Sequence, residues 1–211
     1  MPELPEVETV MRGFRTAFEG QRIRHVTVNR PDLRWPFPLD LRERLEGQDV
    51  LSFHRRAKYI LMRVGNGTSM MLHLGMSGRL LLGQSGMNTT PSKHEHLVLE
   101  TENGARAGLV DPRRFGMVDL VATDQENAHR LLSGLGIEPL SESMTGPNLH
   151  NLMQGTRTPI NTALLDQLLI VGLGNISVFD ALFRIHILPS PIPISLCIRE
   201  QTSLSASIQA T

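Results

Sequence analysis

The sequence predicts an α+β fold, with an antiparallel β-sandwich or barrel flanked by helices in the N-terminal part and a helical region after it. Three observations support this prediction. Apolar residues at helical spacing follow the N-terminus, short alternating runs separated by turn signals fill the next hundred residues, and helical patterns return from about residue 124. Many short strands with few helices between them are typical of antiparallel sandwiches and barrels.

The first helix is predicted to begin near Pro5 and to end at Gly20. Its apolar positions are Val7, Val10, Met11, Phe14 and Phe18. Proline suits the first turn, because the N–H that it lacks would be unpaired there in any case. Glu6 and Glu8 suit the positive end of the helix dipole. A helix start therefore explains these carboxylates without any function, but it does not explain Pro2.

Strand-like runs follow this helix, and one short helix interrupts them. The runs are IRHVTVN, VLSFHRR, KYILMRV, SMMLHLG, RLLL, HLVLET, RAGLVD and MVDLVA, and the helix is DLRERLEG. Gly65-Asn66-Gly67 and Asn103-Gly104 mark turns between strands. Residues 83–93, GQSGMNTTPSK, are predicted to form a long flexible loop.

The helical part is predicted to be a second domain. The stretch DQENAHRLLSGLG is expected to be helical, and a connector rich in Pro, Ser and Gly follows it. We therefore place one domain at 1–134, a linker at 135–147 and a second domain at 148–211. Its helices are expected near 148–154, 160–170, 175–186 and 195–209. The stretch LPSPIP between the last two is not expected to be helical, because of its prolines.

Composition argues against several classes of protein. The chain has 211 residues, 40% of them hydrophobic and 20% charged, which favours a globular fold over disorder. No apolar run reaches about 18 residues and the acidic start is unlike a signal peptide, so we expect no membrane partner. The single cysteine, Cys197, excludes an internal disulfide and a four-thiolate zinc site within this chain, and a cytoplasmic setting is expected. The 21 basic and 21 acidic residues cancel, whereas nucleic-acid-binding domains are usually basic.

Pro2 is the first candidate for chemistry. Methionine before a small residue is commonly removed, which would leave a secondary amine at the N-terminus. The pKa of an α-amino group is about 7.7–8.0, so part of it is unprotonated at neutral pH. Attack of this amine on a sugar C1′ gives an iminium, which acidifies the C2′ proton, as base excision followed by strand cleavage requires. Glu3 is placed to act as a general acid–base. The structural alternative is a plain helix entry.

Lys58, His73 and Met76 form a second group of candidates. Lys58 interrupts an apolar strand pair, as either a rim lysine or one aimed into a groove. His73 lies in an apolar strand, where a histidine is more often a satisfied core residue than a ligand. Met76 stands in a turn with Gly75 and Gly78, and an exposed methionine there suits an apolar wedge between stacked bases.

Arg113, Phe115 and Asn175 complete the candidates. DPRRFG places guanidinium groups and one aromatic ring on a tight turn, suited to phosphates or an unpaired base, or else to a surface turn with Phe115 turned inward. Asn175 follows the glycines of VGLG at a helix start, where backbone N–H groups bind phosphate well. Helix pairs of this kind also serve only for packing.

Taken in order, PELPEVE, RRAKY, HLGMSG, DPRRFG and LLDQ…VGLGNI…ALF closely resemble the bacterial formamidopyrimidine-DNA glycosylase family, from residue 2 to about residue 205. PELPE, rather than PEGPE, favours this branch over its endonuclease VIII relatives. The resemblance implies a β-sandwich domain and a helix-two-turn-helix domain, with damaged double-stranded DNA held between them. It also implies a bifunctional enzyme of base excision repair, which excises 8-oxoguanine and formamidopyrimidines and then cleaves the strand by β,δ-elimination. We expect a monomer in the bacterial cytoplasm, associated with the nucleoid.

The resemblance assigns a catalytic role to three of the candidates. Pro2 would be the Schiff-base nucleophile and Glu3 its partner acid. Lys58 would be a lysine that serves catalysis and contacts a phosphate.

The remaining candidates would contact DNA. His73 and Asn175 would touch the backbone phosphates that flank the flipped nucleotide. Met76, Arg113 and Phe115 would fill the gap left in the double helix and face the orphan cytosine.

The sequence departs from the family pattern in its C-terminal part. Family members continue with a loop that closes on the damaged base and with a four-cysteine zinc finger, whereas this chain stops at Thr211 with only Cys197. We therefore expect a chain truncated before the zinc finger, with no cofactor. Asn161, Ser177 and Asp180 stand where members usually have Lys, Tyr and Glu. Two functions are left open, an active glycosylase and a truncated, catalytically impaired relative that binds damaged or abasic DNA only weakly.

Overall fold

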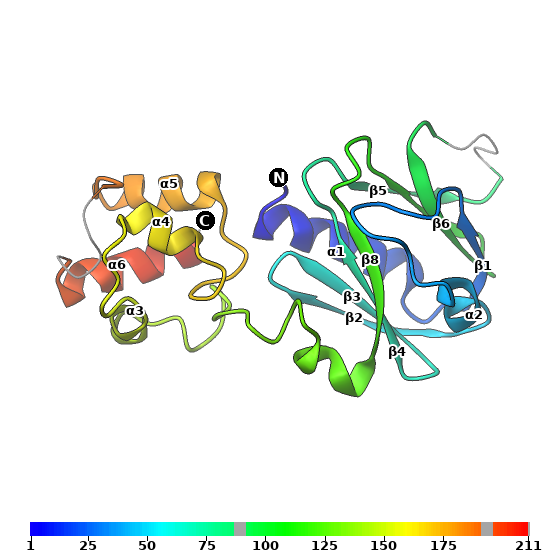
Figure 1. Cartoon of the computed structure of the whole chain (residues 1–211), viewed down its shortest axis with the longest axis horizontal. Helices are drawn as coiled ribbons and strands as arrows, with labels where there is room; N and C mark the ends of the chain where they lie inside the picture. Colours follow the sequence, from blue (N-terminus) through cyan, green and yellow to red (C-terminus); the bar gives the residue numbers. More distant parts are fainter. Residues whose placement is uncertain (87–91, 191–195, 211) are drawn as a thin grey trace. The chain divides into compact units, whose positions relative to one another are not determined.

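The computed structural model describes residues 1–86, 92–190 and 196–210. The chain divides into two compact units, Met1–His129 and Arg130–Thr211 (Figure 1). Residues 135–147, which the sequence suggests as a linker, pack with the second unit. Ile137 forms an isolated β-bridge with Ile170, and Met144 is buried in the helical core. The two units have separate cores and are described separately below.

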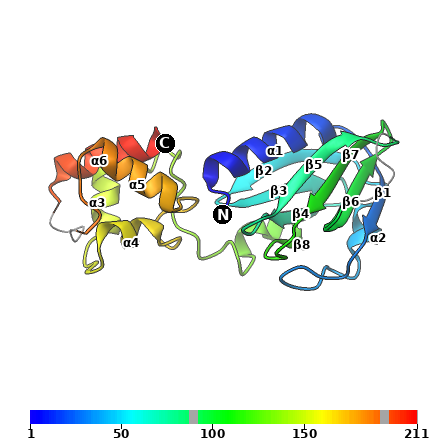
Figure 2. The same cartoon turned by 90° about the horizontal axis from the view of Figure 1, so that it is seen from above.

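The first unit is a sandwich of two antiparallel sheets, as Figures 1 and 2 show. One sheet has the order β1-β6-β7-β5, formed by Ile23–Val28, Glu95–Thr101, Ala105–Val110 and Arg79–Gln84. The other has the order β2-β3-β4-β8, formed by Val50–Arg56, Tyr59–Val64, Thr68–His73 and Met117–Ala122. Strand neighbours in each sheet are joined antiparallel, which confirms the predicted sandwich and excludes the single closed barrel.

Helix α1, Leu4–Phe18, packs along the sandwich against the edge strands β2 and β5 (Figure 2). Phe14 and Phe18 have no exposed surface, and Phe14 meets Phe53 of β2 with ring centroids 4.8 Å apart. The helical spacing read from the sequence is therefore confirmed as the buried face of α1. The short helix α2, Leu41–Leu45, covers β1 and buries two leucines.

The structure corrects the start of one predicted loop and the extent of one predicted helix. Strand β5 continues to Gln84, because Gly83 and Gln84 pair with β7, so the predicted loop begins later; its residues 87–91 lie outside the described residues. The stretch DQENAHRLLSGLG is not a long helix. It forms only the 3₁₀ helix η1, Thr123–Ala128, because Glu126 turns inward to form an ion pair with Arg63. The carboxylate of Glu126 also accepts a hydrogen bond from the hydroxyl group of Ser69.

The second unit consists of four helices around one apolar core. They are α3, Gly146–Leu152, α4, Ile160–Leu165, α5, Asn175–Arg184, and α6, Ile198–Gln209. The core is formed by buried side chains from all four, among them Leu149, Leu164, Val178, Leu182 and Leu204. Helix α4 is shorter than the predicted 160–170, because the carboxylate of Asp166 accepts the N–H of Leu168 and turns the chain. Part of LPSPIP, from residue 191, lies outside the described residues.

None of the helices in the described ranges has the length and apolar character needed to cross a bilayer.

Candidate functional site

The N-terminus is held by the first turn of α1. Glu3 is the N-cap residue and is only 5% exposed. Its backbone N–H donates to Oε2 of Glu6 at 3.0 Å, as one half of a capping box between the two residues. Pro2, which is half-buried, directly precedes this fixed point. The capping box therefore limits how far the N-terminal residues can move from the helix.

Lys58 lies in the two-residue turn between β2 and β3 and is only 6% exposed. Burial lowers the pKa of Lys58 below its ordinary value, while attraction to Glu3 and Glu6 acts in the opposite direction. The lysine is therefore near enough to the start of α1 for the carboxylates of Glu3 and Glu6 to act on its pKa. The structure thus brings Lys58 together with Glu3, and hence with the residue that follows Met1.

Arg55 ties this turn to α1, a role that the sequence patterns did not reveal. Its Nε donates to Oε2 of Glu8 at 2.8 Å, and its Nη1 donates to the carbonyl of Ala57 at 3.0 Å. Ala57 has a left-handed φ of 52°, which a non-glycine residue adopts at a cost. Burial alone would raise the pKa of Glu8, but hydrogen bonds from Arg55 and Arg12 outweigh it and hold the pKa below its ordinary value. Arg55 therefore links the turn that carries Lys58 to helix α1.

His73 ends β4 opposite Tyr59, and their ring centroids are 4.8 Å apart. Its Nδ1 accepts a hydrogen bond from the N–H of Gly75 at 3.1 Å. Burial, and then repulsion from Lys58 and Arg34, lowers the pKa of His73 to about 4. The ring is therefore neutral at pH 7 and carries its proton on Nε2, where it can donate to an anionic group.

Met76 and Phe115 stand on two neighbouring loops of the first unit and are 45% and 43% exposed. The guanidinium carbon of Arg113 lies 4.8 Å from the centroid of the Phe115 ring. Gly75 explains how the loops meet, since a Cβ there would lie 2.3 Å from the carbonyl carbon of Phe115. Its φ of 63° also favours glycine. The alternative of an inward-facing Phe115 is therefore wrong.

Asn175, in the second unit, is the first residue of α5 and is exposed. The side chain of Gln167 shapes the preceding turn: its Oε1 accepts the N–H of Gly172 at 2.9 Å and its Nε2 donates to the carbonyl of Leu173 at 3.2 Å. The N-cap residue, Gly174, has no side chain to cover the first N–H groups of the helix. These groups suit an anion.

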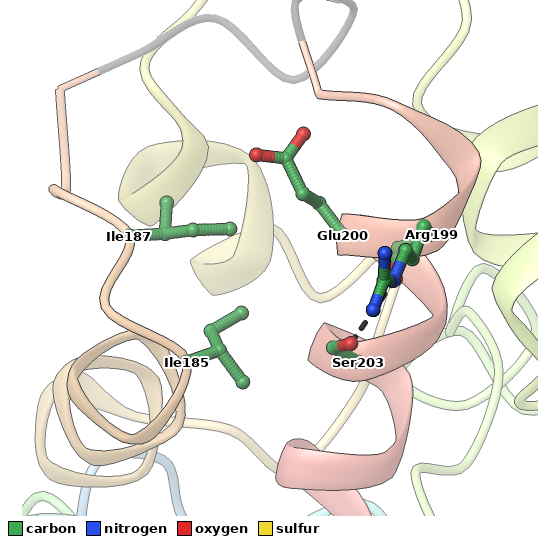
Figure 3. A pocket seen from close by; sticks show the side chains of 5 residues that line it. All are labelled: Ile185, Ile187, Arg199, Glu200 and Ser203. Carbon is green, nitrogen blue, oxygen red and sulfur yellow. Dashed lines mark hydrogen bonds between the residues drawn. The ribbon is translucent and has the colours of Figure 1, made fainter.

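Two further features of the described residues lie outside this group of side chains. Among them, no cluster of three or more His, Cys, Asp or Glu side chains is arranged to hold a metal ion. A hollow of about 380 Å³ lies between the segment after α5 and helix α6 (Figure 3). It is lined by Ile185, Ile187, Arg199, Glu200 and Ser203, none of which is a predicted site residue.

Comparison with known proteins gives the same family for both units. The model of the formamidopyrimidine-DNA glycosylase N-terminal domain matches residues 1–118, and the model of the H2TH domain of the same glycosylase matches residues 135–211. A formamidopyrimidine-DNA glycosylase of Gluconobacter oxydans is 68% identical over 208 residues, which are 99% of this chain and 75% of that protein. One from Acidiphilium cryptum is 52% identical, over 90% of this chain and 67% of that protein.

Solved structures of the Lactococcus lactis Fpg have the same fold as the whole chain. The complex with N7-benzyl-Fapy-dG containing DNA superposes with a TM-score of 0.90 at 30% identity, covering 99% of this chain and 77% of that one. The complex with abasic site containing DNA gives a TM-score of 0.89 at 29% identity, covering 99% and 76%.

Proposed function

The chain belongs to the formamidopyrimidine-DNA glycosylase family, and from this premise we propose how its own residues perform the reaction. It is a DNA glycosylase of base excision repair. Its partner is DNA, as in the solved complexes of its relatives with damaged DNA. We propose that it excises oxidised purines, such as 8-oxoguanine and formamidopyrimidines, from double-stranded DNA and then cleaves the strand. We also propose that it acts as a monomer in the bacterial cytoplasm, at the nucleoid.

The observation that supports this mechanism best is that Lys58 and Glu3 are both buried and that the carboxylate of Glu3, the residue after Pro2, acts on the pKa of Lys58. Removal of Met1 frees the secondary amine of Pro2. Its nitrogen attacks C1′ of the damaged nucleotide, the bond from C1′ to the base breaks, and the departing base takes up the proton that the nitrogen loses. Glu3 gives a proton to the ring oxygen, the bond between C1′ and that oxygen breaks, and an iminium forms between C1′ and the proline nitrogen.

The iminium then serves as the electron sink for strand cleavage. Loss of the C2′ proton expels the 3′ phosphate, and a second elimination expels the 5′ phosphate. Lys58, held at the same place by Arg55 and Glu8, supplies a cation for the phosphates near the reacting sugar. The amine of Pro2 serves as the nucleophile and the carboxylic acid form of Glu3 as the acid in these steps, and we propose that the steps need no bound cofactor.

The other site residues position the DNA in this proposal. His73, neutral at pH 7, donates a hydrogen bond from its Nε2–H group to one phosphate beside the extruded nucleotide. Asn175 and the first N–H groups of α5 bind another phosphate. Met76, Arg113 and Phe115 fill the space left by the extruded base and contact its former partner.

Covalent trapping tests the nucleophile directly. The protein is prepared with an N-terminal tag ahead of Pro2, and half of it is cleaved so that Pro2 becomes the first residue. Borohydride and a duplex containing 8-oxoguanine should yield a cross-linked species with the cleaved protein only, and peptide mass mapping should place it on Pro2. Lys58→Gln should leave the adduct at the same position. Equal trapping of the tagged protein, or an adduct on Lys58, would contradict the proposal.

A further inference from the structure

Asp111 lies buried between the two loops that carry Met76 and Phe115. It has no exposed surface. One oxygen of its carboxylate accepts a hydrogen bond from the hydroxyl group of Ser77, and the other accepts a hydrogen bond from the backbone N–H of Gly116 at 2.7 Å. Ser77 directly follows Met76, and Gly116 directly follows Phe115. The carboxylate of Asp111 is thus hydrogen-bonded to both loops, at the residue that follows Met76 in one and the residue that follows Phe115 in the other.

The same acidic residue also shapes the turn that it begins. Its carbonyl accepts the N–H of Arg114 at 3.2 Å and the Nε2–H of buried His96 at 2.9 Å. The backbone N–H of Arg113 donates to the hydroxyl oxygen of Ser77 at 3.2 Å, which gives a second link between the loops. Arg114 has a φ of 58°, a conformation that persists in a non-glycine residue only when its surroundings enforce it.

This arrangement requires a carboxylate and not merely a polar side chain. Two donors from different loops meet two acceptor oxygens, one on each side of Asp111. An asparagine offers one acceptor oxygen and an NH₂ group, which only donates. Facing Gly116, that group would set two donors against each other. If the NH₂ group faced Ser77 instead, the hydroxyl group of Ser77 would lose the oxygen that accepts its hydrogen bond.

We propose that Asp111 is a positioning residue that fixes Met76 relative to Phe115, and thereby sets how well the enzyme distinguishes the base opposite the lesion. The inference rests on the proposed role of these two side chains in the gap left by the extruded base. Close packing gives the loops little room to compensate, since Gly75 leaves no space for even a Cβ beside Phe115. A small shift of either loop therefore changes the surface that meets the opposite base.

The experiment compares excision of 8-oxoguanine opposite cytosine with excision opposite adenine. The ratio of the two kcat/KM values does not depend on the fraction of protein that is folded. Asp111→Asn should lower this ratio about tenfold, as expected when a hydrogen bond to a charged group is lost. Glu126→Gln is the matched control, because Glu126 is a buried carboxylate of the same unit that bonds Arg63 and Ser69 instead of the loops. It should leave the ratio unchanged.

Two further variants separate this inference from the function on which it rests. Met76→Ala and Phe115→Ala should each lower the ratio; if neither does, the proposed role of the two side chains is wrong. If they do and Asp111→Asn behaves like Glu126→Gln, the positioning role is wrong. In a protein that already carries Phe115→Ala, the further change Asp111→Asn should lower the ratio only slightly more. Should Asp111→Asn fail to fold, Ser77→Ala removes one arm of the same link, and an unchanged ratio in that variant would contradict the inference.

Discussion

The Nδ1 atom of His73 accepts a hydrogen bond of 3.1 Å from the backbone N–H of Gly75. Protonation of Nδ1 would break this bond and would place a cation beside Lys58 and Arg34, the two charged groups that lower the pKa of His73 after burial itself. The pKa in the folded protein is about 4, against 6.5 for an ordinary histidine. The unfolded chain therefore binds more protons than the folded chain between these two values.

The first prediction follows from this difference. The stabilising contribution of neutral His73 is fully present above pH 6.5 and is lost as the pH falls toward 4. His73→Gln should therefore reduce the loss of unfolding free energy between pH 7 and pH 4 by about 3 kcal/mol. Urea unfolding at each pH measures it. The exposed His25 provides the control, and a His25→Gln variant that removed the pH dependence equally would contradict the assignment.

The second prediction concerns the phosphate contact of Lys58. Replacing Lys58 by Gln should lower the slope of log K against log salt by about 0.9, the contribution of one phosphate on duplex DNA. The measurement is a salt titration of binding to an abasic-site duplex. Lys93→Gln is the matched control, since Lys93 is exposed on the segment before β6. Equal slopes for wild type and Lys58→Gln would show that Lys58 does not contact a phosphate.

The third prediction separates the exposed wedge residues from the core. Met76→Ala and Phe115→Ala should each change the unfolding free energy by less than about 0.5 kcal/mol, because both side chains are largely exposed. Both should weaken binding to an abasic-site duplex. Phe14→Ala, in the core, should cost about 3–5 kcal/mol. A large fall in Tm for Phe115→Ala would assign that ring to the core instead.

The fourth prediction concerns the link between Arg55 and Glu8. Arg55→Met should destabilise the protein by about 3 kcal/mol and reduce covalent trapping, because it leaves the carboxylate without its buried partner and releases the turn of Lys58. Arg12→Met removes the exposed partner of the same carboxylate and should cost less than about 1 kcal/mol. Chemical denaturation and trapping yields measure both. Similar losses for the two variants would show that Arg55 does not hold the turn.

Family membership and the main elements could be read from the sequence, because they depend on local order. Helical spacing fixes the buried face of α1, and turn signals delimit the strands. The roles of the candidate residues were indicated less by the chemistry of each side chain than by the order of five motifs along the chain. Taken singly, Lys58, His73 and Phe115 each allowed a purely structural role.

Only the tertiary structure identified the residues that support the site. Arg55 and Glu8 are 47 positions apart, Ser77 and Asp111 are 34 apart, and Arg63 and Glu126 are 63 apart. Such pairs form when strands and loops pack, and no local periodicity records them. Long-range contacts also decide where two elements end. The ion pair of Glu126 limits η1 to one 3₁₀ helix, and pairing with β7 extends β5 to Gln84. Local pattern thus determined which elements form, whereas packing between distant segments decided where they end and which side chains hold the site in place.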